Sequence, residues 1–433
     1  MKKILIVGAG YVGITVSVVL ASFGHEIFLF DTNREKLDAL SSSVIPFYEP
    51  GLIDLFKRFR RNIFLSYKLD DVLDKSDIIF VTVGTNFYLG KEDFSDYQYA
   101  ITNISKHVKR DGKIIVIKST IPIDAIEWTK EEIKKNYKGE ISLVINPEFL
   151  REGNAIDDFL HPDRIVIGVE DDNARKELLE LYKPIDAPKI ITDLKTASMI
   201  KYISNVFLAT KVSFINEVSD ICELYGIDVE EAANAVGLDK RIGSNYLRAG
   251  IGFGGSCLPK DLYSLIDMCD KRSYSPKLIK AVKEVNFDRI EKFVEKIKSV
   301  LGNDEKIIGV WGLSFKANTD DIRESQSIKI IKQLLDKGYI IKAYDPQANK
   351  HAKYIFGNSV EICDDPLSAV KGVHALLVLT DWPQFKDVDL LKVKSLMKDN
   401  YIFDGRNLLD PQKIEKIGFK YFGIGRKTNY NAF

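Results

Sequence analysis

Residues 3–13 have the sequence KILIVGAGYVG, and this stretch decides the fold of the first part of the chain. Its β-branched apolar run at 3–7 is typical of a buried strand and leads directly into the pattern GxGxxG. A helix-forming stretch at 14–22 follows, and then a second apolar run at 26–30 that ends at Asp31. This order of strand, glycines, helix, strand and acid predicts a doubly wound α/β unit that binds a dinucleotide.

Each glycine of the pattern has its own physical task in such a unit. Gly8 allows the tight turn after the strand, Gly10 lets the backbone approach a pyrophosphate, and Gly13 lets the helix pack closely on the strand. The helix N-terminus then presents unpaired N–H groups to the phosphates. Tyr11 and Val12 stand between these glycines, so we expect both residues to belong to the cofactor site.

Asp31 decides which dinucleotide is expected. A carboxylate at this strand end binds the ribose hydroxyls of NAD and repels the 2′-phosphate of NADP. Arg34 follows closely and keeps NADP open as an alternative. The sequence therefore predicts NAD as the cofactor.

Polar clusters follow three further predicted strands, at 77–83, 113–118 and 141–145. The alternation of such strands with helical segments predicts a parallel sheet with right-handed crossovers, in which ligands bind at the carboxyl ends of the strands. The clusters at these ends are Val83-Gly84-Thr85, Lys118-Ser119-Thr120 and Asn146-Pro147-Glu148-Phe149-Leu150. Each cluster alone is also compatible with ordinary loop chemistry.

Residues 193–225 form one long segment of helical period, with apolar residues recurring on one face. Lys201 and Asn205 stand four residues apart, so they share a face of this helix and can point at one site. The alternative is a solvated lysine and asparagine on an exposed face. A long apolar helix between two α/β halves also favours a contact between two copies of the chain, a homodimer.

The pattern of the N-terminal unit repeats later in the chain. A strand at 306–312 reaches glycine, a helix at 325–336 follows, and a strand at 339–344 ends at Asp345. This repeat predicts a second Rossmann-like domain, and the lack of GxGxxG there argues against a second dinucleotide. The loop at 315–325 is rich in groups that bind phosphate, so we expect it to hold the phosphates of another substrate. The alternative is a solvated charged loop.

Composition narrows the class of protein. A chain of 433 residues suggests two or three domains, and its 62 basic and 62 acidic side chains give no basic excess for a nucleic-acid partner. The sequence shows no export signal and no apolar run of about 20 residues, so no membrane partner is expected. The four cysteines lack metal-ligand spacing, which predicts no metal site and free thiols in a reduced, cytoplasmic setting.

The stretch GFGGSCLPKD at 252–261 places Cys257 in a glycine-rich loop. A lysine follows three residues later and an aspartate four residues later, so a nearby cation can favour the reactive thiolate. The alternative is a small buried cysteine in a tight turn.

Characteristic motifs are spread along nearly the whole chain. They are GAGYVG at 8–13, NPEFLREG at 146–153, PDRIVIG at 162–168, KYISNVFLATKVSFINE at 201–217, RIG at 241–243, GFGGSCLPKD at 252–261, GLSFKANTDDIRES at 312–325 and FDGRN at 403–407. Together these motifs resemble the UDP-glucose/GDP-mannose dehydrogenase family. The resemblance implies an NAD-binding Rossmann domain at 1–192, a central helical domain at 193–298 that carries the cysteine loop and forms a dimer, and a Rossmann-like domain at 299–433 that binds the UDP part of the substrate.

The resemblance also implies a reaction. Members of the family oxidise the C6 alcohol of a sugar nucleotide to a carboxylate with two NAD⁺ and an active-site cysteine, which by position is Cys257. An aldehyde gives up no second hydride until a nucleophile adds to it, and a thiol converts it into a thiohemiacetal and then a thioester. The motifs at 146–153 and 162–168 are most similar to the branch that converts UDP-glucose into UDP-glucuronate.

Further catalytic roles are implied residue by residue. Lys201 resembles the lysine that stabilises negative charge at the C6 oxygen, Asn205 its hydrogen-bonding partner, and Asp261 the carboxylate that assists in proton transfers. Glu148 resembles the acid/base group of the thioester stage, and Thr120 resembles the threonine that positions water.

The remaining positions match residues that line the binding sites of the family. Thr85, Thr120 and Glu152 fall at the cofactor site. The sugar-nucleotide positions are Glu148, Phe149, Leu150, Arg151, Lys201, Asn205, Arg241, Phe253, Gly254, Phe315, Lys316 and Arg323. Among these, Arg241 is expected to reach the site from a neighbouring subunit, and Lys316 and Arg323 are expected to lie near the UDP phosphates.

Three positions depart from the family pattern. Asn86 follows Thr85 where members usually have proline, which leaves the shape of this cofactor loop open. Asp124 and Ala125 replace a Gly-Thr pair, and we expect Asp124 to face solvent. Ile145 stands where serine is common, and we expect the change to be tolerated.

Other functions stay open from the sequence. The same chemistry can act on a UDP-N-acetylhexosamine or on GDP-mannose. A two-electron hydroxyacid dehydrogenase of the 6-phosphogluconate type shares the Rossmann start and a catalytic lysine but needs no cysteine. A non-enzymatic NAD-binding regulator needs neither group, so Cys257 separates the first class of reaction from these two.

Overall fold

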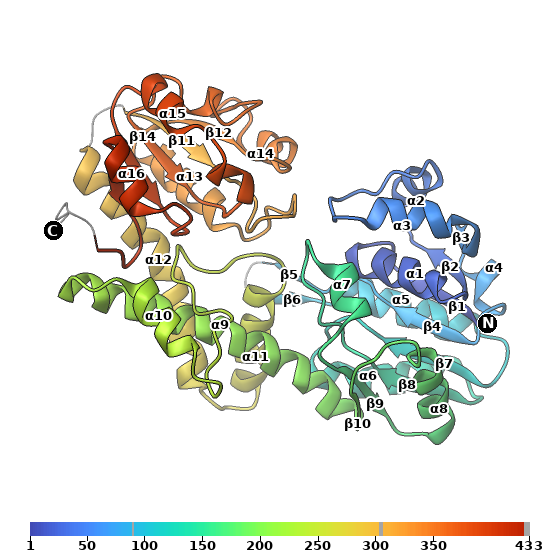
Figure 1. Ribbon diagram of the computed structural model, residues 1–433. Coiled ribbons are helices and arrows are strands. Elements are labelled where there is room, and N and C mark those ends of the chain that lie inside the picture. Colours follow the sequence, from blue (N-terminus) through green and yellow to red (C-terminus); the bar gives the residue numbers. More distant parts are fainter. Residues whose placement is uncertain (89–90, 303–305, 428–433) are drawn as a thin grey trace. The chain divides into compact units, whose positions relative to one another are not determined.

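The computed structural model describes residues 1–88, 91–302 and 306–427, and the chain forms two compact units, Met1–Ser204 and Asn205–Phe433 (Figure 1). The division falls inside helix α9, Leu194–Tyr225, which the sequence predicts as one continuous helix. Each unit has a sheet of its own. The predicted class, two Rossmann-like domains with a long central helix, is confirmed.

The sheet of the first unit has the strand order β10-β9-β8-β7-β4-β1-β2-β3. Its strands are β1 (Lys3–Val7), β2 (Glu26–Phe30), β3 (Ile63–Ser66), β4 (Ile78–Val81), β7 (Lys113–Ile117), β8 (Ile141–Ile145), β9 (Ile165–Val169) and β10 (Lys189–Thr192). Neighbouring strands run parallel, except that β8 and β9 are antiparallel. From β3 to β8 the order is that of a dinucleotide-binding fold, whose ligand lies where the strand order reverses, beyond the ends of β1 and β4.

Helices cover both faces of this sheet (Figure 1). They are α1 (Tyr11–Ser22), α2 (Arg34–Ser41), α3 (Leu52–Phe59), the short η1 (Arg60–Asn62), α4 (Asp70–Leu73), α5 (Ser95–His107), α6 (Ile123–Asn136), α7 (Ala155–Leu160) and α8 (Asp172–Leu181). Strand β1 shows why both faces need cover. Ile4, Leu5 and Ile6 are all fully buried, with Leu5 in a different hydrophobic cluster from its two neighbours. Parallel strands of this kind therefore appear in the sequence as continuous apolar runs.

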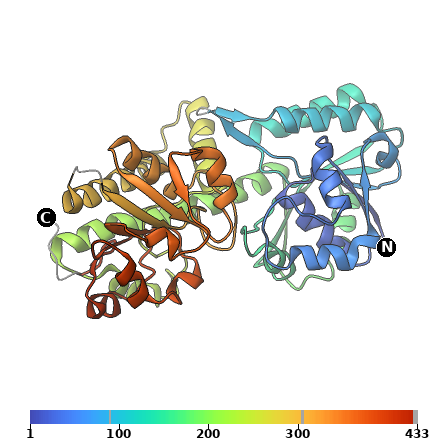
Figure 2. The ribbon, with the colours of Figure 1, turned by 90° about the horizontal axis from the view of Figure 1, so that it is seen from above.

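The departure from the family pattern after Thr85 forms a separate hairpin. Strand β5 (Asn86–Tyr88) pairs antiparallel with β6 (Lys91–Asp93), apart from the main sheet. Figure 2 shows this hairpin standing out from the body of the first unit. The loop that ends at Thr85 thus leads directly into the hairpin.

The second unit begins within α9 and builds a helical layer before its own sheet. The helices are α10 (Val229–Gly237), α11 (Leu258–Lys271), α12 (Lys277–Leu301), α13 (Gln326–Asp336), α14 (Asn349–Phe356), the short η2 (Ser368–Val370) and η3 (Pro383–Lys386), α15 (Leu390–Leu396) and α16 (Pro411–Ile417). The strands are β11 (Ile307–Trp311), β12 (Ile340–Tyr344), β13 (Val360–Ile362), β14 (Ala375–Val378), β15 (Tyr401–Asp404) and β16 (Lys420–Phe422). All neighbouring strands are parallel in the order β13-β12-β11-β14-β15-β16, so the second sheet repeats the strand order of the first.

The repeat extends to the turn after the first strand of each sheet. Gly8 has φ +111° and lies against Thr82, and Gly312 has φ +99° and lies against Thr380. The equivalent aspartates differ in their surroundings. Asp345 is 1% exposed, and one of its oxygens accepts hydrogen bonds from the backbone N–H of Leu313 and Ser314 and from the indole of Trp382. In the second sheet the carboxylate therefore serves the loop itself rather than a ribose.

Within residues 1–88, 91–302 and 306–427, no helix is both long enough and apolar enough to cross a bilayer. Nor do these residues bring together three or more His, Cys, Asp or Glu side chains in a group that could hold a metal ion.

The turn at Gly312 gives a test of close backbone approach. A Cβ on Gly312 would lie 2.4 Å from Cβ of Thr380, whereas a Cβ on Gly338, at a similar φ of +87°, would meet no atom within 4 Å. Gly312→Ala should lower the free energy of unfolding by about 1–3 kcal/mol more than Gly338→Ala, because overpacking adds to the cost of positive φ. Urea denaturation measures both changes, and equal losses would contradict the close approach.

Candidate active site

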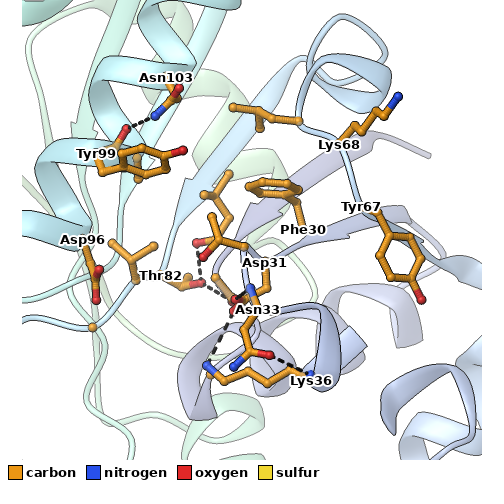
Figure 3. A pocket seen from close by; sticks show the side chains of 18 of the residues that line it. Phe30, Asp31, Asn33, Lys36, Tyr67, Lys68, Thr82, Asp96, Tyr99 and Asn103 are labelled. Carbon is orange, nitrogen blue, oxygen red and sulfur yellow. Dashed lines mark hydrogen bonds and ion pairs between the residues drawn. The ribbon is translucent and has the colours of Figure 1, made fainter. Parts of the chain in front are cut away.

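A cavity of about 480 Å³ opens at the carboxyl ends of β1, β2 and β4 (Figure 3). Its wall combines the glycine loop with polar residues after β2 and residues of α5. The lining includes Gly8, Gly10, Phe30, Asp31, Asn33, Lys36, Thr82, Gly84 and Tyr99. The cavity thus lies where the sequence predicts the dinucleotide.

The glycine loop fits a dinucleotide. A Cβ on Gly13 would lie 1.8 Å from the carbonyl oxygen of Gly8, so only glycine lets α1 pack against this turn. A Cβ on Gly10 would meet no atom within 4 Å, which leaves space beside the backbone for a ligand. Gly10 is also the N-cap of α1 and brings no capping side chain, so the first N–H groups of the helix are suited to a pyrophosphate.

Asp31 is held in place by the turn that it faces. Its carboxylate accepts hydrogen bonds from the backbone N–H of Ala9 at 2.7 Å and of Asn33 at 2.8 Å. Lys36 Nζ lies 3.7 Å from the same carboxylate. Figure 3 shows the side chains of Asp31, Asn33 and Lys36 close together at the cavity. A carboxylate fixed in this way is suited to the ribose hydroxyls of NAD. Lys36 was not predicted from the sequence, although its position in the first turn of the helix after β2 was available as a signal.

Tyr11 links the glycine loop to the segment after β8. Its hydroxyl donates to the buried carboxylate of Glu49, and the backbone N–H of Gly153 donates to both Tyr11, at 3.1 Å, and Glu49, at 2.6 Å. Burial, together with the nearby Glu49 carboxylate, raises the pKa of Tyr11 well above its usual range. The side chain of Tyr11 therefore serves this link, and its contact with the cofactor stays a prediction.

Glu148 and Lys201 form a buried ion pair within the first unit. Lys201 Nζ donates to Glu148 at 2.9 Å, and the two residues are 3% and 9% exposed, respectively. The other oxygen of Glu148 accepts from the N–H of Leu150 at 2.5 Å. The ring of Phe149 lies between two cations, with Arg164 at 3.9 Å and Lys201 at 5.4 Å from its centroid. The predicted positions 148–150 and Lys201 are thus brought together.

Lys118 joins the ends of β7 and β8. Its Nζ donates to the side-chain and backbone oxygens of Asn146 at 3.1 and 3.3 Å, and Tyr182 donates to the same side-chain oxygen. Burial lowers the pKa of Lys118 to about 8. This network fixes the start of the segment that carries Glu148. Thr120 lies half-buried just beyond Lys118.

Cys257 is the N-cap of helix α11 in the second unit. A helix N-terminus favours a thiolate. One turn later, Asp261 is 1% exposed and accepts from Asn205 Nδ2 at 2.5 Å and from Lys260 Nζ at 2.6 Å. Asn205 thus contacts Asp261 in the first turn of the helix that Cys257 caps.

The other cysteines have different surroundings. Burial raises the pKa of the Cys222, Cys269 and Cys363 thiols. A raised thiol pKa disfavours the nucleophilic thiolate at neutral pH. Among the four cysteines, Cys257 is the one that lies at the N-terminus of a helix.

The glycines before Cys257 allow close contact with the 315–325 loop. A Cβ on Gly254 would lie 2.3 Å from the carbonyl oxygen of Glu324, and a Cβ on Gly255 would lie 2.6 Å from the ring of Phe315. Gly255 also has φ +83° and donates its N–H to the carbonyl of Arg323 at 3.1 Å. The cysteine loop and the predicted phosphate loop therefore pack directly on each other.

Arg406 organises both loops and was not assigned a role from the sequence, although it lies in the motif FDGRN. Its guanidinium donates to the carbonyls of Gly252 at 3.2 Å, Phe315 at 3.0 Å and Leu379 at 2.8 Å. One arginine thereby ties three separate segments of the second unit together.

Arg323 and Arg241 are exposed and paired with neighbouring acids, whereas Lys316 is half-buried. Arg323 forms a fork with Asp321, and Arg241 forms one with Asp239. Lys316 Nζ lies 5.7 Å from the Phe315 ring centroid. The expected contacts of Arg323 and Lys316 with the UDP phosphates, and of Arg241 with the site of a neighbouring subunit, stay predictions.

Two of the positions that depart from the family pattern, Asp124 and Ile145, lie in the first unit. Asp124 is exposed in the first turn of α6, which confirms that it faces solvent. Ile145 is buried at the end of β8.

Family models match the chain in three consecutive stretches. The NAD binding domain of the UDP-glucose/GDP-mannose dehydrogenase family matches residues 2–186, its central domain matches 195–288, and its UDP binding domain matches 309–411. The chain belongs to the UDP-glucose/GDP-mannose dehydrogenase family. It is thus an NAD-dependent dehydrogenase, and NAD is the cofactor that the cavity beside Asp31 fits.

Several relatives of this family are similar over their whole length. UDP-glucose 6-dehydrogenase TuaD of Bacillus subtilis is 41% identical, with 98% of this chain and 94% of that protein covered. UDP-glucose 6-dehydrogenase of Rickettsia bellii is 40% identical, with 98% and 100% covered. The solved UDP-glucose dehydrogenase of Pyrobaculum islandicum has a TM-score of 0.92 at 34% identity, with 98% of each chain covered. The UDP-N-acetyl-mannosamine dehydrogenase Cap5O of Staphylococcus aureus has a TM-score of 0.80 at 26% identity, with 98% of each chain covered.

Asp31 gives a direct test of the cofactor site. Asp31→Ala removes the predicted ribose acceptor, so NAD binding should weaken about tenfold or more, in line with the loss of a charged hydrogen bond. Isothermal titration calorimetry with NAD measures the change. Glu35→Ala, at an exposed side chain of α2 that does not line the cavity, is the matched control and should leave the affinity unchanged. An Asp31→Ala protein that binds NAD as tightly as the parent would contradict this site.

Proposed function

We propose that this dehydrogenase oxidises UDP-glucose at C6 to UDP-glucuronate. Near full-length similarity to proteins named UDP-glucose 6-dehydrogenase supports this substrate over the other sugar nucleotides of the family. The observation that carries the reaction type is Cys257 at the N-terminus of α11, one turn before the buried Asp261. A two-electron dehydrogenase or an NAD-binding regulator has no use for this arrangement.

The reaction converts UDP-glucose, two NAD⁺ and one water into UDP-glucuronate, two NADH and three protons. NAD⁺ supplies the hydride-accepting chemistry in both oxidation stages. In the first stage the C6 alcohol loses a proton and a hydride and becomes an aldehyde. The Cys257 thiolate then forms a bond to C6, and the resulting thiohemiacetal carries the second hydride. Loss of this hydride leaves a thioester. Water then breaks the C–S bond and releases the carboxylate and the thiol.

Charged and polar side chains have distinct tasks in this reaction. Lys201 is a fixed cation that stabilises negative charge on the C6 oxygen. Asn205 donates a second hydrogen bond, and Asp261 accepts protons through water. Glu148, which Lys201 holds in place, assists hydrolysis of the thioester, and Thr120 positions the attacking water.

Substrate recognition is assigned to two groups of residues. In the first unit the sugar-binding group consists of Phe149, Leu150 and Arg151 with Glu152 beside the cofactor. In the second unit the backbone of Phe253 and Gly254 and the side chains of Phe315, Lys316 and Arg323 hold the UDP part. The packing of Gly254 and Gly255 against the 315–325 loop supports this second group. The proposed domains are an NAD-binding domain at 1–192, a central helical domain at 193–298 and a UDP-sugar-binding domain at 299–433.

The thiol chemistry is tested by the stoichiometry of NADH. With limiting UDP-glucose the parent enzyme should form about two NADH per sugar, because alcohol is carried to acid. Cys257→Ala should lower acid formation by roughly a thousandfold or more, as expected for loss of a nucleophile. Absorbance of NADH and chromatography of the sugar product measure these outcomes.

Controls separate this proposal from its alternatives. Cys269→Ala, on the same helix α11, should leave the rate unchanged. UDP-N-acetylglucosamine, UDP-N-acetylmannosamine and GDP-mannose should be poor substrates beside UDP-glucose. One NADH per sugar, or full activity of Cys257→Ala, would contradict the thioester route.

The proposed functional form is a homodimer. Phe207 and Phe214 are 62% and 56% exposed, and Ile221 extends the same face of α9 at the same spacing. A stripe of exposed large apolar residues is typical of an interface. The exposed Arg241 is assigned to the active site of the partner copy.

Reversal of the polarity of this stripe tests the dimer. The double variant Phe207→Glu/Phe214→Glu should sediment as a monomer, because four charges would be buried at the interface, and it should lose most activity. Tyr354→Glu, at a side chain that is 93% exposed on α14, is the control and should stay dimeric. Sedimentation velocity reports both masses, and an unchanged mass of the double variant would place the interface elsewhere.

A further inference from the structure

The peptide groups of Phe253 are held from two sides by carboxamide side chains. Asn286, on α12, accepts from the N–H of Phe253 at 2.8 Å and donates to its carbonyl at 3.1 Å. Gln326, the first residue of α13, donates to the same carbonyl at 2.8 Å. Three hydrogen bonds thus fix one residue of the glycine-rich loop.

This contact is built into the packing of the second unit. Gln326 is 1% exposed and Phe253 is buried, so the hydrogen bond between them is shielded from competing water. Gly252 has φ +98°, and a Cβ there would lie 2.5 Å from Asn286 Oδ1 and 2.9 Å from Gln326 Nε2. Both carboxamides can therefore reach the Phe253 peptide only because residue 252 is a glycine.

The rest of the loop is attached on either side of Phe253. Arg406 donates to the carbonyl of Gly252, and Gly255 donates to the carbonyl of Arg323. Cys257, two residues after Gly255, is the N-cap of helix α11. A shift of Phe253 therefore acts on a short segment that ends at the thiol.

We propose that Asn286 and Gln326 are positioning residues that hold the cysteine loop in its reactive arrangement. This inference rests on the proposed function of Cys257 as the nucleophile. Glycines give a free loop many backbone conformations, and a misplacement of reacting atoms by about 1 Å can cost a hundredfold in rate. The two carboxamides remove that freedom without contact with the sulfur.

Gln326→Met removes the donor and keeps the length of the side chain, and Gln333→Met on the same helix is the matched control. Hydrogen exchange of the 249–257 peptide, measured without substrate, should speed up about fivefold for Gln326→Met, the effect of one lost hydrogen bond. Gln333→Met should exchange like the parent. Asn286→Ala should loosen the peptide further, and the double variant should show less than the sum of the two effects because both side chains bind one carbonyl.

Turnover supplies the second readout. For Gln326→Met, kcat with UDP-glucose should fall about fivefold or more, while KM for NAD changes less than twofold. Gln326→Glu should be slow at neutral pH, where an acceptor faces the Phe253 carbonyl. It should recover towards the parent as the pH falls, because a protonated carboxyl again donates.

The outcomes separate this inference from the proposed function. Faster exchange together with a lower kcat supports the positioning role. Unchanged exchange in Gln326→Met, or faster exchange with unchanged kcat, overturns it. If the parent protein forms no NADH with UDP-glucose, the proposed function fails, and the exchange rates alone decide whether the carboxamides hold the loop.

Discussion

Two buried carboxylates set the electrostatic constraint on this chain. Glu148 and Asp261 are 9% and 1% exposed, and a charge at such depth is stable only when donors reach it. Helix α9 supplies a partner to each, Lys201 to Glu148 and Asn205 to Asp261. These partners stand four residues apart on α9, one in each unit.

The same sheet order serves different purposes in the two units. In the first, Gly10 leaves open space beside the backbone and Asp31 lines a cavity, so the turn accepts a dinucleotide. In the second, Asp345 is buried, and its carboxylate accepts hydrogen bonds from Trp382 and from the backbone of the loop after β11. A repeat of backbone architecture therefore does not repeat the ligand, since the side chains around the equivalent aspartate decide what it binds.

The sequence predicts those features whose causes are local. Strand and helix positions follow from apolar periodicity, and the cofactor turn and cysteine loop follow from glycine spacing. It does not predict the residues that hold the site, because their partners lie far along the chain. Asn286 and Gln326 meet Phe253 across 33 and 73 residues, and Glu49 meets Gly153 across 104. An asparagine or glutamine on a helix has no sequence signal that tells which distant peptide it binds.

The proposed reaction requires that the sulfur of Cys257 becomes covalently bonded to C6 during turnover. The most direct measurement is peptide mass spectrometry of the Glu148→Gln enzyme, quenched in acid after mixing with UDP-glucose and excess NAD⁺, since slow hydrolysis should let the thioester accumulate. We expect a UDP-glucuronyl adduct on the peptide that contains Cys257 and none on the peptides with Cys222 or Cys363. Formation of two NADH per sugar with no adduct at Cys257 at any time point would contradict it.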